Sequence, residues 1–498
     1  MEIKKNDVID VEITDIGSGG EGIGKADGFT FFVKDAVPGD KVKAHITKVK
    51  KTYAYAKTEK VISPSPFRVI PECEFAVPCG GCQLQALSYD RELEYKKDKV
   101  KNALIRIGGF DEEFTDEVML PVIGMDEGDF RYRNKMQIPF GTDKEGNIIA
   151  GFYAGRTHNI ISCSDCLLGF EEHKDILSDI ISFAKENSIS VYDEKTGKGI
   201  LRHALLRKGF ATGEIMVCLI VNADKLPHAD ALTEKLLKRN EFFKDPVRIT
   251  SISINVNKEN TNVILGKKCD LLWGKEYITD KIGSLTFRIS PLSFYQVNPI
   301  QTKKLYDTAL SFASLTGREN VLDLYCGTGT ISLFLAQKAG RVHGVEIVPE
   351  AIKNAKENAV LNGIVNATFS VGKAEDLTEE TVMGFFDNSS NVDVIVVDPP
   401  RKGCDPACID TMLRLAPSRI VYVSCDPATL ARDLKILCAG GYEIVKVRPT
   451  DMFKKTVHVE SCVLLTRVSN RKADSYVKLN VKIEDYYRIK DAEKKTDE

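Results

Sequence analysis

The sequence has no apolar run approaching the ~20 residues that a membrane helix needs, and its start, MEIKKNDVIDVEI, lacks the apolar core of a signal peptide. Its 13 cysteines are too sparse among 498 residues for a disulfide scaffold. The net charge of only -2 gives the whole molecule no excess that would attract a polyanion. These absences predict a cytoplasmic protein without membrane contact, in a reducing compartment where cysteines serve metal binding or catalysis.

The length and the local patterns predict several domains. Residues 1–62 read as short alternating strands with glycine-rich turns such as GSGGEGIG, which is typical of a small β-barrel. Residues 63–288 mix strand and helix patterns and predict an α+β domain. Residues 289–467 alternate strands with helices, as a doubly wound α/β sheet requires. The extension 468–498 is expected to end in disorder.

The barrel region carries a local excess of positive charge. Between Lys41 and Arg68 there are seven Lys and one Arg against a single acid, Glu59, with Tyr53 and Tyr55 interleaved. Basic strands with aromatic residues on a small barrel are typical of a nucleic-acid surface. An ordinary solvated face would have the same composition, and the sequence alone leaves both interpretations open.

A nucleotide-type cofactor site is indicated by VLDLYCGTGTISLFLAQKAG, where a buried strand passes through two glycines into an amphipathic helix. The next strand, RVHGVEIV, contains Glu346, placed to accept hydrogen bonds from ribose hydroxyls. A nicotinamide dinucleotide would use the same logic, but Ser332 stands where its fingerprint needs a third glycine. The motif resembles the S-adenosylmethionine loop of class I methyltransferases more closely. A tight strand-to-helix turn without any ligand is the remaining interpretation.

Three further residues carry potential chemistry. Asp398 ends a buried strand in VDVIVVDPPRKG, and Cys425 ends the next one in VYVSCDPATLAR, so both are expected at the carboxyl edge of the sheet. Glu460 lies in the late strand VHVESCVLLTR, where a carboxylate among apolar residues is costly without a partner or a task. A small residue packed at a strand end is the alternative explanation for Cys425.

These residues fit one reaction. Carbon 5 of uracil is a poor nucleophile, but addition of the Cys425 thiolate at carbon 6 makes it able to attack a sulfonium methyl group. A base, Glu460, must then remove the proton at carbon 5 so that the thiol can leave. Asp398 would accept the N3-H of the ring, because an ionised carboxylate only accepts. Class I methyltransferases that act on amino groups usually have an aromatic residue after the two prolines. Arg401 stands at that position here, so the resemblance to this class argues against methylation of an exocyclic amine.

The chain resembles the bacterial RNA uracil-5 methyltransferases, in particular the 23S ribosomal RNA branch. The resemblance covers residues 1 to about 467 and rests on a TRAM-like barrel, FYQVN, LDLYCGTGT, DPPRKG, SCDPATLARDL and HVESC in that order. It implies a class I methyltransferase fold with an OB-like TRAM barrel, S-adenosylmethionine as cofactor, RNA as partner and a monomer. Thr330 departs from some relatives, which have Asn there. The implied roles are nucleophile for Cys425, general base for Glu460, and cofactor contact for Gln296, Tyr325, Glu346 and Asp398.

The resemblance also assigns the cysteines of the middle region. Cys73, Cys79, Cys82 and Cys166 resemble the four-cysteine iron-sulfur site of the ribosomal branch, which makes this region an iron-sulfur-binding α+β domain. Four thiolates suit either such a cluster or zinc, and the family favours a 4Fe-4S cluster. Cys163 lies close enough in sequence to compete with Cys166 as the fourth ligand.

Three alternatives to a ribosomal RNA enzyme remain open at this stage. The first is a transfer RNA uracil-5 methyltransferase. The second is a metal-stabilised RNA-binding protein without catalysis, which would need neither Cys425 nor Glu460. The third is a nicotinamide-dependent oxidoreductase with an iron-sulfur cluster, which the incomplete glycine fingerprint disfavours.

Overall fold

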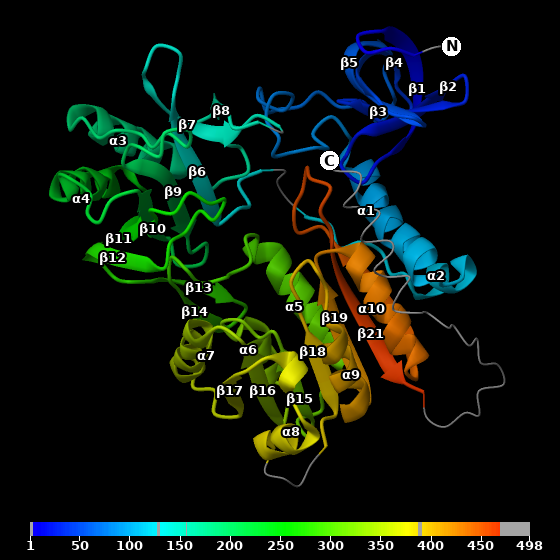
Figure 1. Cartoon of the computed structure of the whole chain (residues 1–498). Coiled ribbons are helices and arrows are strands. Elements are labelled where there is room, and N and C mark those ends of the chain that lie inside the picture. The colour runs from blue at the N-terminus through cyan, green and yellow to red at the C-terminus, as the bar shows by residue number, and fades with distance from the viewer. Residues whose placement is uncertain (1–2, 127–129, 156, 387–390, 469–498) are drawn as a thin grey trace.

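The computed structural model describes residues 3–126, 130–155, 157–386 and 391–468 and comprises an N-terminal barrel, a central sheet and a C-terminal α/β domain (Figure 1). The barrel is closed, with strand order β1-β2-β3-β5-β4. In β1, Val11 and Ile13 point into the barrel core while the residues between and beside them face outward. The predicted small barrel is therefore confirmed. Its strands are β1 (Val8–Ile16), β2 (Gly22–Ala26), β3 (Phe29–Lys34), β4 (Lys41–Val49) and β5 (Tyr53–Ser63).

The central region begins with a helical arm and continues into a seven-stranded sheet in the order β12-β11-β10-β9-β6-β7-β8. The arm consists of α1 (Tyr89–Ala103), the π-helical turn η1 (Leu104–Gly108) and α2 (Glu112–Val118). The sheet and its helices comprise β6 (Lys135–Thr142), β7 (Ile148–Tyr153), β8 (Ile160–Ser162), α3 (His173–Glu186), β9 (Leu201–Lys208), β10 (Glu214–Val221), α4 (Ala229–Arg239), η2 (Asn240–Phe242), β11 (Arg248–Val256) and β12 (Lys268–Gly274).

The C-terminal domain is built on a second seven-stranded sheet in the order β17-β16-β15-β18-β19-β21-β20. The first five strands are parallel, and β21 runs antiparallel to both β19 and β20. The hairpin β13 (Ile278–Ile282) and β14 (Leu285–Ile289) precedes it. The sheet strands are β15 (Asn320–Leu324), β16 (Arg341–Glu346), β17 (Ala367–Val371), β18 (Val394–Val397), β19 (Arg419–Ser424), β20 (Tyr442–Thr450) and β21 (Glu460–Arg467).

Helices cover both faces of this sheet, as the alternation of its strands predicts. In β15, Val321 belongs to the apolar cluster formed with α5, α6 and α7, whereas Leu322 and Leu324 belong to the cluster formed with α9 and α10. The predicted doubly wound α/β class is confirmed. The helices are α5 (Pro299–Ala313), α6 (Thr330–Ala336), α7 (Pro349–Leu361), η3 (Ala374–Asp376), α8 (Glu379–Phe385), α9 (Pro406–Leu415) and α10 (Pro427–Ala439).

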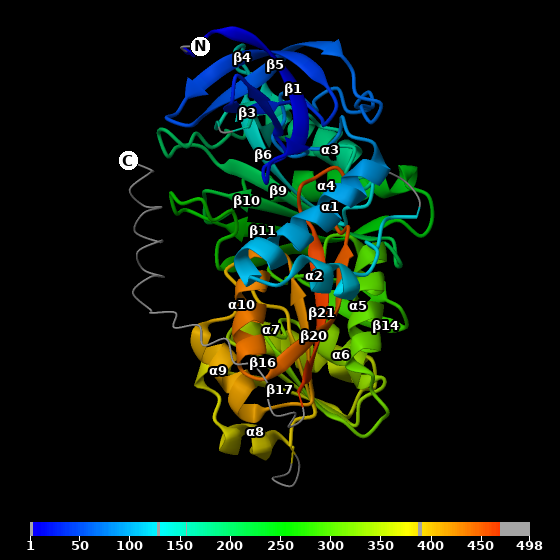
Figure 2. The same cartoon turned by 90° about the vertical axis from the view of Figure 1, so that its right-hand side faces the viewer.

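Helix α1 lies beside the C-terminal sheet although it precedes that domain by some two hundred residues in the sequence (Figure 2). It contacts α10 and β20, and so links the region after the barrel to the edge of the C-terminal domain. Among the described residues, no helix combines the length and apolarity needed to cross a membrane. The predicted domain limits stay predictions, and the expected disordered end lies beyond the described residues.

Candidate active site

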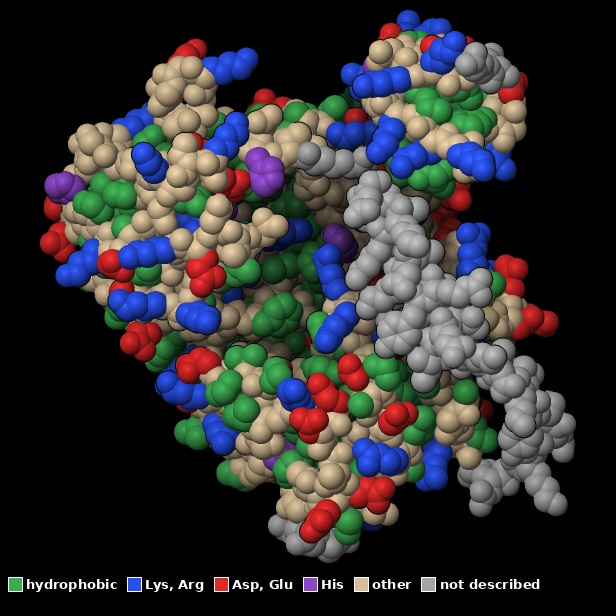
Figure 3. Space-filling view, viewed as in Figure 1, with side chains coloured by type: hydrophobic (Ala, Val, Ile, Leu, Met, Phe, Trp, Pro, Cys, Tyr) green, Lys and Arg blue, Asp and Glu red, His purple; other side chains and the backbone are tan. Residues whose placement is uncertain are grey.

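A cavity of about 620 Å³ opens at the carboxyl edge of the C-terminal sheet. The space-filling view shows a hollow between this domain and the central sheet (Figure 3). The predicted nucleophile, base and cofactor residues all line the cavity, each from a different part of the fold. They are Gln296 before α5, Tyr325 after β15, Glu346 at the end of β16, Asp398 after β18, Cys425 after β19 and Glu460 at the start of β21.

Cys425 is held at a sharp corner between β19 and α10. The Ser424 hydroxyl accepts a hydrogen bond from the backbone N-H of Asp426 at 3.1 Å. The Asp426 carboxylate caps α10 by accepting from the N-H groups of Ala428 at 2.9 Å and Thr429 at 3.1 Å. Pro427 occupies the first turn of the helix, where its missing N-H costs nothing. The thiol is therefore fixed at the cavity wall and stays partly exposed to it.

The thiol and the two carboxylates share an electrostatic environment. Burial raises the pKa of Cys425 to about 11, and the nearby carboxylates of Glu460 and Asp398 contribute to the increase. Burial also raises the pKa of Glu460 to about 8, with Asp398 adding to the shift and Arg401 opposing it. The pKa of Asp398 rises through burial to about 7. Burial therefore shifts both carboxyl groups toward the protonated form near neutral pH, where each would be ionised in water.

The sequence interpretation gave no role to His458, yet its ring lines this cavity. It lies two residues before Glu460, and its ring centroid is 6.0 Å from that of Phe453, which also faces the cavity. Burial, followed by the positive charge of Arg401, lowers the pKa of His458 to about 4, so the imidazole is neutral at physiological pH. The motif HVESC includes His458, but this residue precedes β21, so strand alternation could not place its side chain.

The turn from β15 into α6 leaves one side of the cavity open. Tyr325, Gly327 and Gly329 adopt positive φ angles of 64°, 55° and 79°. A Cβ atom at Gly329 would meet Ala355 and Phe369 at 3.0 Å, whereas one at Gly327 would meet nothing within 4 Å. Gly329 is therefore needed for packing and for its backbone conformation, while Gly327 keeps the loop surface clear.

Backbone N-H groups hold the side chain of Glu346, the last residue of β16. The Glu346 carboxylate accepts hydrogen bonds from the N-H groups of Gly327 at 3.3 Å and Val348 at 3.0 Å. Each carboxylate oxygen can accept a further hydrogen bond from a ligand. Thr330 also lines the cavity, and its hydroxyl lies 2.8 Å from that of Tyr306.

A second cavity of about 670 Å³ lies between the barrel, α1 and the start of α10. The barrel contributes Phe32, and α1 contributes charged side chains that include Arg91 and Lys99. Arg401, Cys425 and His458 line both cavities. The thiol of Cys425 can therefore be approached from the barrel side as well as from the side of the loop between β15 and α6.

The cysteines of the middle region gather at a third cavity of about 340 Å³. Cys73, Cys79, Cys82, Cys166 and the rival residue Cys163 all line it. Burial raises the pKa of both Cys82 and Cys163 to about 12, and the neighbouring thiols contribute to each shift. Within the ranges that the structure describes, no three His, Cys, Asp or Glu side chains converge closely enough to hold a single metal ion. The thiols line the wall of the cavity and do not converge on the position of a single ion.

Arg131, in the basic stretch RYRNK, supports this cysteine region. Its guanidinium group forms an ion pair with Asp165 at 2.6 Å and donates to the backbone carbonyl of Cys166 at 3.2 Å. Asn134 donates to the carbonyl of Gln296 at 2.9 Å, which links the stretch to the neighbouring cavity. These contacts tie Arg131 and Asn134 to the protein interior.

Sequence comparison places the chain among RNA-modifying enzymes. The sequence model of the tRNA (Uracil-5-)-methyltransferase family matches residues 213–468, and that of the TRAM domain matches residues 3–58. A protein of Halalkalibacterium halodurans described as an RNA methyltransferase is 50% identical over 463 residues, covering 93% of this chain and 98% of that protein. A Clostridium tetani protein with the same description is 48% identical and covers 95% of this chain and 99% of its own length.

Structural comparison agrees with these matches. The crystal structure of Pyrococcus abyssi tRNA (uracil-54, C5)-methyltransferase, in complex with S-adenosyl-L-homocysteine, superposes with a TM-score of 0.71. The two sequences are 29% identical, and the match covers 92% of this chain and all of the other. With the family model matching half of the sequence and close relatives matching nearly all of it, the chain belongs to the tRNA (uracil-5-)-methyltransferase family and carries an N-terminal TRAM domain.

Proposed function

We propose that this protein transfers a methyl group from S-adenosylmethionine to carbon 5 of a uridine in RNA, through a covalent bond between Cys425 and carbon 6. The observation that carries the proposal is the convergence of Cys425, Glu460 and Asp398 on one cavity with the glycine loop and Glu346. A binding module would gain nothing from a partly exposed thiol beside two carboxylates whose burial is costly.

The residues divide the reaction between them. Cys425 adds as the thiolate to carbon 6, Asp398 accepts the ring N3-H, and Glu460 takes the proton from carbon 5 before the thiol leaves. S-adenosylmethionine, when bound, supplies the methyl group. The clear loop surface at Gly327 would leave room for its adenosine, and Glu346 would accept hydrogen bonds from the ribose hydroxyls. Gln296, Tyr325, Glu346 and Asp398 are the residues that would hold it.

The raised pKa values support the assignment of Glu460 as the base. A base that must take a carbon-bound proton works best with a pKa near the operating pH, and Glu460 has a pKa of about 8. The thiol, with a pKa of about 11, needs a positive charge or a proton acceptor on substrate binding. Arg401 lies close enough to lower the pKa of Cys425. We propose that it also stabilises the thiolate during addition.

The RNA partner would approach through the cavity between the barrel and α1, which also reaches Cys425. We propose 23S ribosomal RNA as the substrate, on the basis of the cysteine pattern. Transfer RNA is the second candidate, because the structural neighbour from Pyrococcus abyssi is named as a tRNA (uracil-54, C5)-methyltransferase. Mapping of 5-methyluridine in both RNA classes, in cells with and without the gene, separates them. A cytoplasmic location and a monomeric state belong to the same proposal.

A 4Fe-4S cluster held by Cys73, Cys79, Cys82 and Cys166 is part of the proposal. The donor set fits, because such clusters are bound by four thiolates set apart by the cluster itself, and the thiols line one cavity. Anaerobically purified protein should contain about four irons and four sulfides per chain. A colourless protein with one zinc ion would contradict the cluster, and Cys163→Ala against Cys166→Ala identifies the fourth ligand by iron content.

The covalent step can be tested with two variants. Cys425→Ala should form neither product nor adduct, because carbon 5 then stays non-nucleophilic. Glu460→Gln should transfer the methyl group and stall, leaving a protein-RNA adduct that survives denaturing electrophoresis and forms only with cofactor and substrate RNA. The double variant Cys425→Ala, Glu460→Gln should form no adduct. A Cys425→Ala enzyme that makes 5-methyluridine at near the normal rate would overturn the proposal.

A further inference from the structure

The chain between β20 and β21 is irregular, and it carries two side chains that line the active-site cavity. Thr450 ends β20 and pairs with Glu460, which begins β21, so residues 451–459 form the connection between these partners. Phe453 and His458 of this connection face the cavity. The position of the proposed base therefore depends on what holds residues 451–459.

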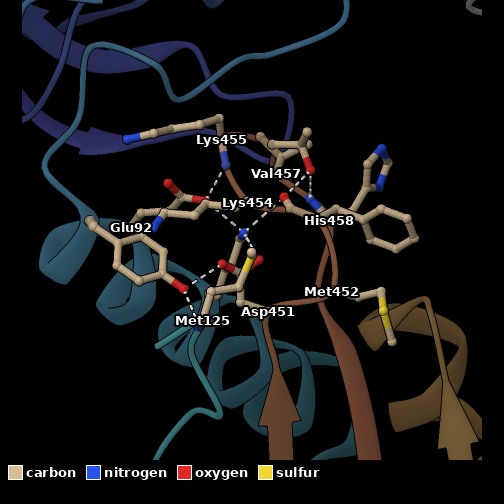
Figure 4. Close-up of polar contacts among 12 residues, drawn as sticks. Glu92, Met125, Asp451, Met452, Lys454, Lys455, Val457 and His458 are labelled. Carbon is tan, nitrogen blue, oxygen red and sulfur yellow. Dashed lines mark hydrogen bonds and ion pairs between the residues drawn. The ribbon is translucent and has the colours of Figure 1, made fainter. Parts of the chain in front are cut away.

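A buried ion pair from α1 holds the start of this connection (Figure 4). The Lys96 ammonium group lies 2.7 Å from a carboxylate oxygen of Glu92 and 2.5 Å from one of Asp451, and it donates to the carbonyl of Phe453 at 3.2 Å. Asp451 is the residue after Thr450, and Thr450 is the strand partner of Glu460. Lys96 thus fixes the chain next to the base.

The other members of this network hold further points of the connection. The Glu92 oxygen that bonds Lys96 also accepts from the backbone N-H of Lys455 at 2.7 Å. Tyr89 donates from its hydroxyl to Asp451 at 2.9 Å, and the same hydroxyl accepts from the backbone N-H of Met125 at 2.7 Å. Figure 4 shows the carboxylates of Glu92 and Asp451 pointing toward the same position. Tyr89, Glu92 and Lys96 of helix α1 thus contact the connection within this network.

The burial of these charged groups costs free energy, so the network is a poor source of stability. The side chains of Lys96, Glu92 and Asp451 are all fully buried, and one ammonium group faces two carboxylates. Burial raises the pKa of Glu92, and its second oxygen has no hydrogen-bond partner among the described residues. Apolar side chains of similar volume would often stabilise such a position equally well or better. Its use is therefore better explained by the geometry that it specifies.

The same helix borders the cavity on the barrel side. Arg91, Tyr95 and Lys99 line that cavity, while Glu92 and Lys96 point to the buried network. Lys99 also donates to the carbonyl of Val457 at 2.8 Å, near the end of the connection. One face of α1 thus meets the space proposed for RNA, and the other fixes the chain that carries His458 and leads to Glu460.

We propose that Lys96 is a positioning residue, whose ion pairs with Glu92 and Asp451 fix residues 451–459 so that Glu460 reaches the proton on carbon 5. The inference rests on the proposed function. It separates two steps: addition of Cys425 and methylation depend on the corner at α10, whereas proton removal depends on the network. Removal of the Lys96 charge should slow release of the methylated product more than formation of the adduct.

RNA with 5-fluorouridine at the target separates these steps, because fluorine at carbon 5 cannot be removed as a proton and the methylated adduct stays bound to Cys425. Lys96→Met, which keeps the side-chain length without the charge, should form this adduct within about threefold of the normal rate. With uridine RNA at saturating substrates it should accumulate adduct, and turnover should fall about tenfold or more. Rapid-quench electrophoresis measures both rates.

Two further variants control for folding. Glu92→Gln with Lys96→Met removes one unpaired buried carboxylate and should fold better while releasing product as slowly. Lys208→Met breaks a largely buried ion pair with Glu172 in the central sheet, 2.7 Å long, and should leave the ratio of the two rates unchanged. Thermal unfolding of each variant establishes that the compared proteins are folded.

The outcomes are distinct. Equal reduction of adduct formation and turnover in the folded variants, or no reduction in either, would overturn the role of Lys96. A double variant that does not fold would assign the ion pair to stability alone and overturn it as well. Failure of the unaltered protein to form any fluorouridine adduct would contradict the proposed function itself, and with it this inference.

Discussion

Cys425 owes its position to its immediate neighbours in the sequence. The apolar strand ending at Ser424 and the capping residue Asp426 with Pro427 define the corner, and all of these signals are local. The sequence therefore predicted where the thiol lies. Its pKa could not be predicted in the same way, because the shift depends on Glu460 and Asp398, which reach the corner from other strands.

His458 and Cys163 illustrate what the sequence leaves undetermined at single residues. The motif HVESC names a strand, but which of its residues face a cavity depends on where the strand begins, and β21 starts only at Glu460. Cys163 and Cys166 both reach the third cavity. The sequence spacing does not decide which of the two is the fourth ligand of the proposed cluster, because the loop between them can turn either thiol toward the cavity.

The pKa of Glu460 predicts how product release depends on pH. Only ionised Glu460 removes a proton, so release should rise about tenfold per pH unit below its pKa and level off near pH 8. The decay of preformed adduct, followed across this range, measures it. In Asp398→Asn the plateau should begin at lower pH, since a neighbouring negative charge is removed. A flat profile would contradict the assignment of Glu460 as the base.

The same pKa predicts a stability effect with a definite sign. The folded-state pKa of Glu460 exceeds its ordinary value of 4.5, so the favourable contribution present below that value is lost as pH rises toward 8. Glu460→Gln cannot ionise. It should be more stable than the unaltered protein at pH 8, by roughly 1–4 kcal/mol, and similar near pH 4.5. Urea unfolding at the two values measures the difference, and equal stability at both would contradict a buried, proton-binding Glu460.

At the scale of elements, alternation of strands and helices was sufficient to predict the α/β sheet and the barrel. Such patterns did not predict which residues of helix α1 are buried. Its sequence, YDRELEYKKDKVKNA, is mostly polar and resembles an exposed helix, yet Glu92 and Lys96 are fully buried. The cause is Asp451, which lies 355 residues away in the sequence and reaches Lys96 only in the folded chain. Local periodicity carries no information about such a partner.

The barrel is attached to the rest of the chain by charge as well as by backbone. Arg68 pairs with the fully buried Asp40 at 2.6 Å, so this end of the basic stretch is occupied within the protein. Removal of residues 1–62 would leave Arg68 without its partner and confuse stability with RNA affinity. Substitution of exposed lysines is therefore the cleaner test of the basic stretch.

Lys48, Lys50 and Lys51 are exposed where β4 turns into β5, beside the aromatic pair Tyr53 and Tyr55. Changing the three to Gln should weaken RNA binding and reduce the slope of log affinity against log salt by about one for each RNA phosphate that is no longer neutralised. Filter binding over a salt series measures this. Matched Gln substitutions of Lys144, Lys195 and Lys198, which are exposed on the central domain, should change the slope less. Equal slopes in both variants would make the barrel lysines an ordinary solvated face.

At the scale of the whole molecule, the net charge of -2 is an average over two cavities whose charged side chains differ. The cavity beside Glu346 is lined by six acidic and three basic side chains, whereas the cavity between the barrel and α1 is lined by three acidic and four basic ones. The overall composition averages the charges of the two cavities, and the charge pattern of each domain separates them only partly. That the two cavities share Cys425 follows from the packing of three domains, which no single segment of sequence encodes.

The identity of the cofactor can be tested on the intact protein. A ligand that binds only the folded state stabilises it by about 2.7 kcal/mol at a concentration one hundred times its Kd. S-adenosylhomocysteine should therefore raise the unfolding temperature in a concentration-dependent way, and Glu346→Ala should reduce the shift by removing an acceptor for the ribose hydroxyls. NAD at the same concentrations should leave the temperature unchanged, because Ser332 stands where a dinucleotide fingerprint needs glycine and is fully buried against Asp323. A shift with NAD that equals or exceeds the shift with S-adenosylhomocysteine would favour the oxidoreductase alternative and remove the methyl donor from the mechanism.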